Sequence, residues 1–289
     1  MAAALCAVAG PAGAAALFTD CRGERSASPT VILESGAFGV AADWDLVLDD
    51  LAKGGRVCAY DRAGVGASTP RAGSEDAVAI ADELAALLDT LGETGRVILV
   101  GHSNGALYIE AFAAKWPQRT AGLVYINGVN SVDLDYPELV GDLASERRLA
   151  DLAATVGGLG LAPLVSGILT NGLGLKGQAA ERKRQGLNDA ARLRVARDED
   201  RAMIPSLSLV RDLGGSPRNV PTAIIVGWTA PGLDISRSWR AAGAALAARA
   251  RTAWVLEPMG ATHVSPLLRD RAYVAAAVSW LRSLTSSGR

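Results

Sequence analysis

Histidine, cysteine and lysine are scarce in this 289-residue chain, which has two, three and four of them respectively. No two cysteines have the Cys-x-x-Cys spacing, and this absence argues against a metal-binding or thioredoxin-like motif. The formal net charge is only −1, so the sequence carries no basic footprint for nucleic acid or for an acidic membrane surface. We therefore expect a small-molecule substrate, with no cofactor, no metal and no nucleic-acid partner.

The first part of the chain lacks an uninterrupted hydrophobic run. Residues 1–17 are apolar, but two glycines and a proline break the run, and no lysine or arginine precedes it. The stretch is too short and broken for a membrane span, and it lacks the basic region that opens a signal peptide. We interpret residues 1–27 as an N-terminal leader or partial signal, and we favour export (periplasmic or secreted) over a cytoplasmic location. In an exported protein Cys21 and Cys58 could form a disulfide; two ordinary thiols are the alternative.

Short apolar strands alternate with amphipathic helical segments over most of the chain. Hydrophobic residues make up 49% of it and charged residues 20%, so the chain can bury a substantial core. This alternation predicts an α/β fold, with a mostly parallel central sheet and helices on both faces. The expected strands are 31–33, 56–60, 97–100, 123–126, 222–226 and 253–256, and the expected helices are 77–91, 235–250 and 270–284.

Between residues 132 and 219 the pattern changes, because apolar helical segments and glycine-rich stretches replace the strands. We interpret 132–219 as a helical cap inserted over the carboxyl ends of the strands, where open α/β sheets bind their ligands. Residues 28–131 and 220–289 then form the core of the protein.

Two sets of charged residues invite a functional interpretation that we do not adopt. Asp61 and Arg62 lie in a glycine-rich turn after a strand, and we expect them to brace that turn through a carboxylate and guanidinium network. The charged cluster between Arg194 and Arg201 is expected to be a solvated face of a helix in the insertion.

The strand 97–100 runs directly into a Gly-His-Ser-Asn-Gly turn, from Gly101 to Gly105, and an apolar helix follows. A serine on such a turn has its hydroxyl exposed at the top of a sheet, with a helix N-terminus behind it. The glycines are needed because side chains there would collide with the neighbouring strand and helix. Five-residue patterns recur by chance, but the strand before this one and the helix after it favour Ser103 as a nucleophile.

We call the turn from Gly101 to Gly105 the elbow. Three further stretches accompany it: Pro-Thr-Val-Ile-Leu-Glu-Ser-Gly at 29–36, Tyr-Asp-Arg-Ala-Gly-Val-Gly-Ala-Ser at 60–68, and Gly-Ala-Thr-His at 260–263. Together these motifs resemble the α/β-hydrolase superfamily, and in particular its capped, esterase-like serine hydrolases. The resemblance covers residues 29–133 and 220–284 and implies the α/β-hydrolase fold. Related dehalogenases and epoxide hydrolases carry an Asp nucleophile at the elbow, so Ser103 argues against both activities.

The resemblance places the catalytic base in the loop after the last strand, and His263 occupies that place, in the order Ser then His. The chemistry needs such a group, because a serine hydroxyl is a poor nucleophile until an imidazole takes its proton. A histidine of a solvent-exposed loop is the alternative for His263. The other histidine, His102, adjoins the nucleophile and is expected to be packed or hydrogen-bonded in a structural role.

The resemblance also implies an oxyanion hole formed by two main-chain N–H groups. One belongs to Asn104, at the start of the helix after the elbow, and the other to Ala37, in the loop after the first strong strand. Phe38 and Trp228 are expected to lie beside the substrate.

At the third catalytic position the sequence departs from the family pattern. The resemblance places an acid at the end of one of two strands, but those positions hold Asn127 and Ala230. Asn127 could orient His263 by accepting its Nδ1–H bond through the amide oxygen, and Asn127→Asp should then increase ester hydrolysis. Asp234 is the alternative, if its loop bends back, unless it only caps the following helix. Looser candidates at the entry to the cap are Asp133 and Asp135.

The motifs and the resemblance predict a cofactor-free serine hydrolase that cleaves an ester, thioester or lactone of a small apolar molecule through an acyl-enzyme on Ser103. A non-hydrolytic enzyme of the same fold (a lyase, cyclase or acyl transferase) is the alternative, and the missing acid favours it. A binding protein that has lost catalysis is the second alternative. Labelling with a fluorophosphonate would separate this last class from the two enzymes, and a panel of esters and lactones would separate the first two.

Overall fold

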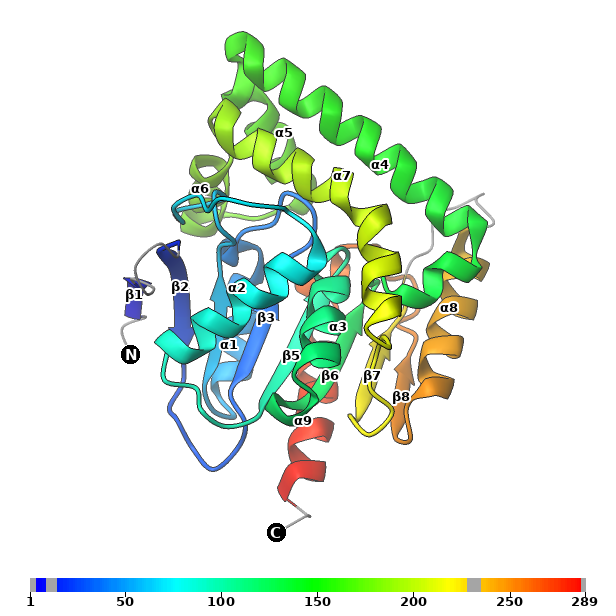
Figure 1. Ribbon diagram of the computed structural model, residues 1–289. Helices are drawn as coiled ribbons and strands as arrows, with labels where there is room; N and C mark the ends of the chain where they lie inside the picture. The colour runs from blue at the N-terminus through cyan, green and yellow to red at the C-terminus, as the bar shows by residue number, and fades with distance from the viewer. Residues whose placement is uncertain (1–3, 9–14, 228–234, 287–289) are drawn as a thin grey trace.

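The computed structural model describes residues 4–8, 15–227 and 235–286, and within them eight strands form one sheet in the order β1-β2-β4-β3-β5-β6-β7-β8 (Figure 1). The strands β3 to β8 all run parallel to one another, whereas β2 runs antiparallel to both of its neighbours, β1 and β4. The expected mostly parallel sheet is confirmed. The strands are β1 (Ala4–Val8), β2 (Leu17–Arg22), β3 (Val31–Glu34), β4 (Val57–Tyr60), β5 (Val97–His102), β6 (Thr120–Ile126), β7 (Thr222–Ile225) and β8 (Ala253–Leu256).

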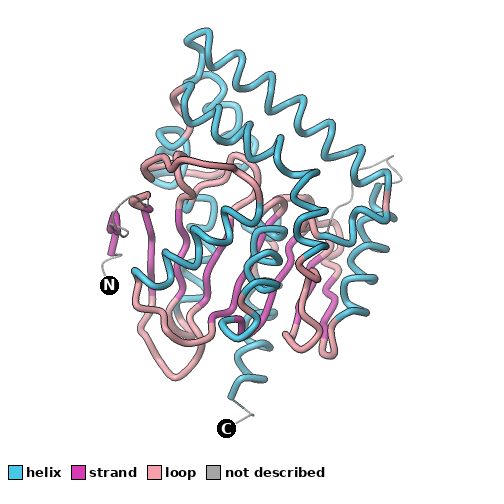
Figure 2. Tube along the Cα trace, in the orientation of Figure 1, coloured by secondary structure: helices cyan, strands magenta, loops and turns pink. Residues whose placement is uncertain are grey.

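Helices cover both faces of the sheet (Figure 2). Because successive side chains of a strand point to opposite faces, Val31 and Leu33 pack into one apolar layer and Ile32 into the other. Every residue of β3, β5 and β6 is buried, which explains why these strands read as continuous apolar runs. One layer contains α1 (Asp45–Ala52) and α9 (Ala272–Ser286), and the other contains α2 (Ala77–Thr90), α3 (Gly105–Lys115) and α8 (Ile235–Arg249). Short turns of helix lie at Ala41–Trp44, Pro117–Arg119, Ser131–Asp135 and Ser265–Leu267.

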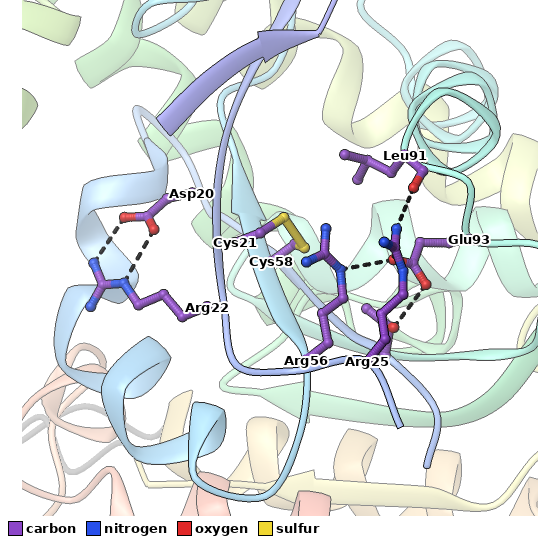
Figure 3. The surroundings of a disulfide bond; sticks show 9 residues. Asp20, Cys21, Arg22, Arg25, Arg56, Cys58, Leu91 and Glu93 are labelled. Atoms are coloured by element: carbon purple, nitrogen blue, oxygen red, sulfur yellow. Dashed lines mark hydrogen bonds and ion pairs between the residues drawn. A yellow bond between two sulfur atoms is a disulfide. The ribbon is translucent and has the colours of Figure 1, made fainter. Parts of the chain in front are cut away.

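Part of the segment that we interpret as a leader is folded into the sheet. The described part of residues 1–27 contains β1 and β2, which extend the sheet as its antiparallel edge. The pairing of β2 with β4 sets Cys21 opposite Cys58, and the two form a disulfide, one of the two alternatives left open (Figure 3). Next to Cys21 on β2, the Arg22 guanidinium forms an ion pair of 2.8 Å with the buried carboxylate of Asp20. No local sequence pattern indicates this edge, because the partner strand β4 lies far along the chain.

The chain between β6 and β7 forms helices above the sheet, and we refer to this segment as the cap. Long helices α4 and α7 pack along one another above the sheet, with α5 and α6 beside them (Figure 1). A π-helical turn, Gly157–Leu161, joins α4 to α5, and Gly160 there has a φ of +85°, which reverses the chain. The cap helices are α4 (Pro137–Val156), α5 (Ala162–Leu173), α6 (Gly177–Gly186) and α7 (Ala190–Asp212).

Candidate active site

Ser103 occupies the sharp turn between β5 and α3, with a φ of +54°. A residue with a side chain is strained in this left-handed region, and such strain is typical of functional turns. The Ser103 N–H donates to the carbonyl of Ile126 on the neighbouring strand at 3.0 Å, which fixes the turn against the sheet. A Cβ on Gly105 would lie 2.5 Å from the carbonyl oxygen of Glu34, and one on Gly101 would lie 2.6 Å from the first turn of α3. Both glycines therefore permit the close approach that the elbow requires.

His263 lies in the loop after β8 and lines the same cavity as Ser103. Its ring packs against the ring of His102, with 4.7 Å between the centroids. Burial, and then the neighbouring His102, lower the pKa of His263 to about 3. The imidazole is therefore neutral at physiological pH, which is the state that can accept a proton from a serine hydroxyl.

His102 has a hydrogen-bonded structural role, as expected from the sequence. Its Nε2 lies 2.9 Å from the main-chain oxygen of His263, and since a carbonyl only accepts, the Nε2 carries the hydrogen. Burial lowers the pKa of His102 to about 4, so this ring is also neutral. The residue before the nucleophile thus holds the loop that carries the candidate base.

Asn127 also holds that loop, and this corrects the expected contact with the imidazole. Its amide oxygen accepts from the Gly227 N–H at 2.8 Å, and its amide nitrogen donates to the main-chain oxygens of His263 at 3.0 Å and Thr262 at 3.4 Å. A φ of +43° at Asn127 turns the side chain toward these main-chain groups. Asn127 therefore fixes the backbone of the His263 loop instead of accepting from its ring.

Of the other candidates for the third position, the two that the structure describes do not join this group. Asp133 is buried but accepts from Asn130 at 2.9 Å, and Asp135 is exposed and paired with Arg211 at 3.0 Å. Asp234 and Ala230 lie outside the described residues, as does Trp228, the second residue expected beside the substrate.

The loop after β3 packs directly on the nucleophile. A Cβ on Gly36 would lie 2.8 Å from the Cβ of Ser103, and Ala37 and Phe38 line the same cavity. Asn104 stands at the N-cap of α3, where main-chain N–H groups have no partner within the helix. Both candidate oxyanion residues thus lie near Ser103: Asn104 follows it in the chain, and Ala37 lines the same cavity.

Two buried cations hold this loop. The guanidinium of Arg62 donates to the carbonyl oxygens of Ser35 at 2.7 Å and Gly36 at 3.0 Å. Lys183, from α6 of the cap, donates to the carbonyl oxygen of Phe38 at 2.5 Å, and Phe38 has a strained φ of +52°. Three carbonyl oxygens of this loop are thus held by buried cations.

The bracing role expected for Asp61 and Arg62 is confirmed. Asp61 accepts from the Ala41 N–H at 2.7 Å and from the Ala67 N–H at 2.8 Å. Arg62 pairs on one side with Glu34, and on the other with Glu199 of α7 at 2.7 Å.

The prediction that residues 194–201 form a solvated helix face is wrong in part, as the pairing of Glu199 with Arg62 shows. Glu199 and Asp200 are buried, because α7 lies between α4 and the core and turns these two carboxyl groups inward. Asp200 accepts from the side-chain Nδ2 of Asn104 at 2.7 Å. Burial, and then the nearby carboxylates of Glu146 and Glu199, raise the pKa of Asp200 to about 8. Burial also raises the pKa of Glu146 to about 7.

These groups surround a cavity of about 460 Å³ between the core and the cap. Its floor contains Ser103 and both histidines, with the loop 36–38 at the side. The apolar wall from the cap is formed by Leu149, Ile168, Leu169 and Leu173, and the polar wall by Asp43, Glu146, Lys183 and Asp200. The sequence interpretation missed the four polar residues, because no motif marks them and their helices carry many other charges. Among the described residues, no group of three His, Cys, Asp or Glu side chains is placed to hold a metal ion.

Comparisons with known proteins agree with this architecture. Over 107 residues the chain is 38% identical to a candidate carbamate hydrolase, RutD, of Stutzerimonas stutzeri, a match covering 36% of this chain and 39% of the relative. Over 96 residues it is 38% identical to the bifunctional esterase/perhydrolase DCH of Acinetobacter calcoaceticus, covering 33% of this chain and 34% of that protein. The chain thus matches little more than a third of the length of either relative.

A solved esterase from Thermogutta terrifontis shares the fold over 98% of this chain and 99% of its own, with a TM-score of 0.68 at 24% identity. A model of the alpha/beta hydrolase family matches residues 31–277, from the first parallel strand into the last helix. Because that match spans most of the sheet, the elbow and the cap, the chain belongs to the alpha/beta hydrolase family.

Proposed function

We propose that the protein is a cofactor-free serine hydrolase that cleaves an ester, thioester or lactone through an acyl-enzyme on Ser103. One observation carries the proposal: Ser103, on its strained turn, and a neutral, half-buried His263 line a single cavity. A nucleophile and a proton acceptor on the same enclosed surface are what acyl transfer to serine requires.

In the proposed reaction, His263 takes the proton of the Ser103 hydroxyl as the oxygen attacks the carbonyl carbon of the substrate. The carbonyl oxygen becomes an oxyanion, which the main-chain N–H groups of Ala37 and Asn104 stabilise. His263 then protonates the leaving group, and a water molecule hydrolyses the acyl-enzyme by the same steps. Each step uses only groups of this chain, the substrate and water.

The cap suggests which substrates fit. Four aliphatic side chains of α4 and α5 form one wall of the cavity and favour an apolar acyl or alcohol part. On the polar wall, Asp200 retains its proton at neutral pH and can donate a hydrogen bond to the substrate. The partial matches to an esterase and a candidate carbamate hydrolase support acyl chemistry of this kind.

The experiment is a panel of activated esters, thioesters and lactones of increasing chain length, measured for kcat and KM. We expect turnover of at least one class, with KM falling as the apolar part grows to fill the cavity. Release of the alcohol without release of free acid would instead show acyl transfer, and conversion without acyl release would show a lyase or cyclase. Inertness toward the whole panel would contradict the hydrolase proposal.

A further inference from the structure

The hairpin formed by α4 and α5 carries an exposed apolar face. Leu149 is 68% exposed, Leu159 76% and Ile168 64%, whereas aliphatic side chains of this size are usually buried in a soluble protein. Contiguous apolar patches on a folded surface mark sites of interaction. We call the following set the hairpin face: Leu149, Leu152, Leu159, Leu161, Leu164 and Ile168.

The hairpin is shaped to enter a lipid surface and not to cross it. Pro137–Leu173 is long and apolar enough to span a membrane by length and composition, and only 28% of its most apolar window is buried. The chain reverses at Gly160, however, and α5 returns alongside α4. The turn between these helices projects from the end of the cap farthest from the sheet (Figure 1). A projecting apolar tip of this kind can lie in the interface plane of a bilayer.

Although the net charge of the whole chain is only −1, the local charges around the hairpin favour an anionic lipid surface over a second protein copy. Residues 152–175 contain no charged side chain, and Arg147, Arg148 and Lys176 flank them. These three cations are exposed and form no ion pair with another described residue, whereas nearby Asp151 is neutralised by Arg201 at 2.7 Å. In a twofold dimer the same face would meet itself and set these cations against one another. Anionic headgroups would neutralise them.

The hairpin face is also continuous with the catalytic cavity. Leu149 and Ile168 belong to the face and at the same time line the cavity that contains Ser103. We propose that the hairpin face docks on an anionic lipid bilayer, so that the mouth of the cavity opens at the membrane surface. On the proposed function, the substrate is then an amphiphilic ester drawn from the bilayer.

The test uses the full chain with Ser103→Ala, so that binding is measured without turnover. It is mixed with vesicles of phosphatidylcholine alone, or of equal parts phosphatidylcholine and phosphatidylglycerol, and the bound fraction is measured by flotation. We expect binding to the anionic vesicles that weakens as salt increases. Adding Leu159→Ser and Leu164→Ser should weaken it by about tenfold or more, because the tip loses its apolar area. Arg147→Gln with Arg148→Gln should weaken binding to the anionic vesicles only.

The matched control is Leu209→Ser with Leu213→Ser, which changes two leucines that are 41% and 42% exposed at the end of α7, outside the hairpin face. This control should bind like the parent. If the parent binds neither kind of vesicle, the proposal is overturned. It is also overturned if the control loses as much vesicle binding as the tip variant, which carries Leu159→Ser and Leu164→Ser. A dimer in sedimentation velocity that the tip substitutions dissociate, with no vesicle binding, would show that copies of the chain cover this face, and would also overturn it.

The outcome is independent of the proposed hydrolase activity. With Ser103 restored, the tip variant should hydrolyse a short water-soluble ester at the parental rate, because neither substituted leucine lines the cavity. Vesicle binding without any ester hydrolysis would contradict the proposed function alone. Hydrolysis without vesicle binding would contradict the docking surface alone.

Discussion

The Nε2–H of His102 donates to the main-chain oxygen of His263 at 2.9 Å, so the elbow and the loop of the candidate base are joined by a direct hydrogen bond. His102 therefore positions the loop that carries His263. The residue before the nucleophile and Asn127 both donate to this one oxygen, so two side chains hold the loop at the same point.

Replacing His102 should slow catalysis in a way that depends on the donor and not on the ring. His102→Leu removes one of the two donors to the main-chain oxygen of His263, the other being Asn127, and should lower kcat by about tenfold, with little change in KM. His102→Gln retains an N–H at a similar reach and should keep most of the activity. Steady-state kinetics on one activated ester, with melting temperatures as the control for folding, distinguish the two. Equal losses in both variants would contradict a role for this hydrogen bond.

The contacts of Asn127 reverse the effect expected for Asn127→Asp. A carboxylate at this position would face the carbonyl oxygens of His263 and Thr262, which now accept from the amide nitrogen. We expect a loss of stability of about 2 kcal/mol or more, and a lower rate of ester hydrolysis, because an acceptor replaces a buried donor. Urea denaturation and initial rates measure the two effects. A faster hydrolase of unchanged stability would instead support the orienting role inferred from the sequence.

Lys183 links the cap to the loop that carries Ala37. Its Nζ contacts the Phe38 oxygen at 2.5 Å and the Asp43 carboxylate at 2.8 Å. Lys183→Met should destabilise the fold by about 3 kcal/mol, because it leaves a buried carboxylate without its counter-ion. Adding Asp43→Asn should restore much of the stability but not kcat, since the Phe38 carbonyl still lacks a donor. Recovery of kcat together with stability would assign Lys183 a purely structural role.

Asp200 should make stability depend on pH in a direction opposite to that of an ion-paired carboxylate. Its pKa rises from 3.8 to about 8 on folding, so between these values the folded state holds a proton that the unfolded state has lost. Stability therefore falls as pH rises through this window. Because one pKa unit corresponds to about 1.4 kcal/mol, even half of the shift amounts to roughly 3 kcal/mol.

Asp200→Asn removes this dependence while its amide oxygen can still accept from Asn104. The variant should be close to the parent in stability at about pH 4 and more stable at about pH 8, as measured by urea denaturation. A stability difference that does not change with pH would show that Asp200 is ionised in the folded protein.

The sequence was sufficient for the parallel strands of the sheet and for the elbow, because both rest on local patterns. The apolar run 97–100, the paired glycines around Ser103 and the following helix are contiguous, and their sterics are the same in the structure. Buried Asp200 could not be predicted, because its neighbours on α7 are charged residues typical of a solvated face. The antiparallel strand β2 was not predicted, because its pairing with β4 depends on residues distant in sequence.

Asn127 shows a different limit of sequence reasoning. The position of Asn127 directly after β6 was predicted correctly. The direction of its amide, however, depends on a φ of +43°, which no local sequence pattern predicts. The third catalytic position therefore cannot be read from residue type alone.

The most direct test of the account is the mass of the intact protein after reaction with a fluorophosphonate. We predict that one phosphonyl group attaches, that peptide mapping places it on Ser103, and that Ser103→Ala abolishes it. His263→Ala should label far more slowly, because the hydroxyl loses its proton acceptor. Labelling of Ser103→Ala at the rate of the unaltered chain, or attachment at another serine, would contradict the assignment of Ser103 as the nucleophile.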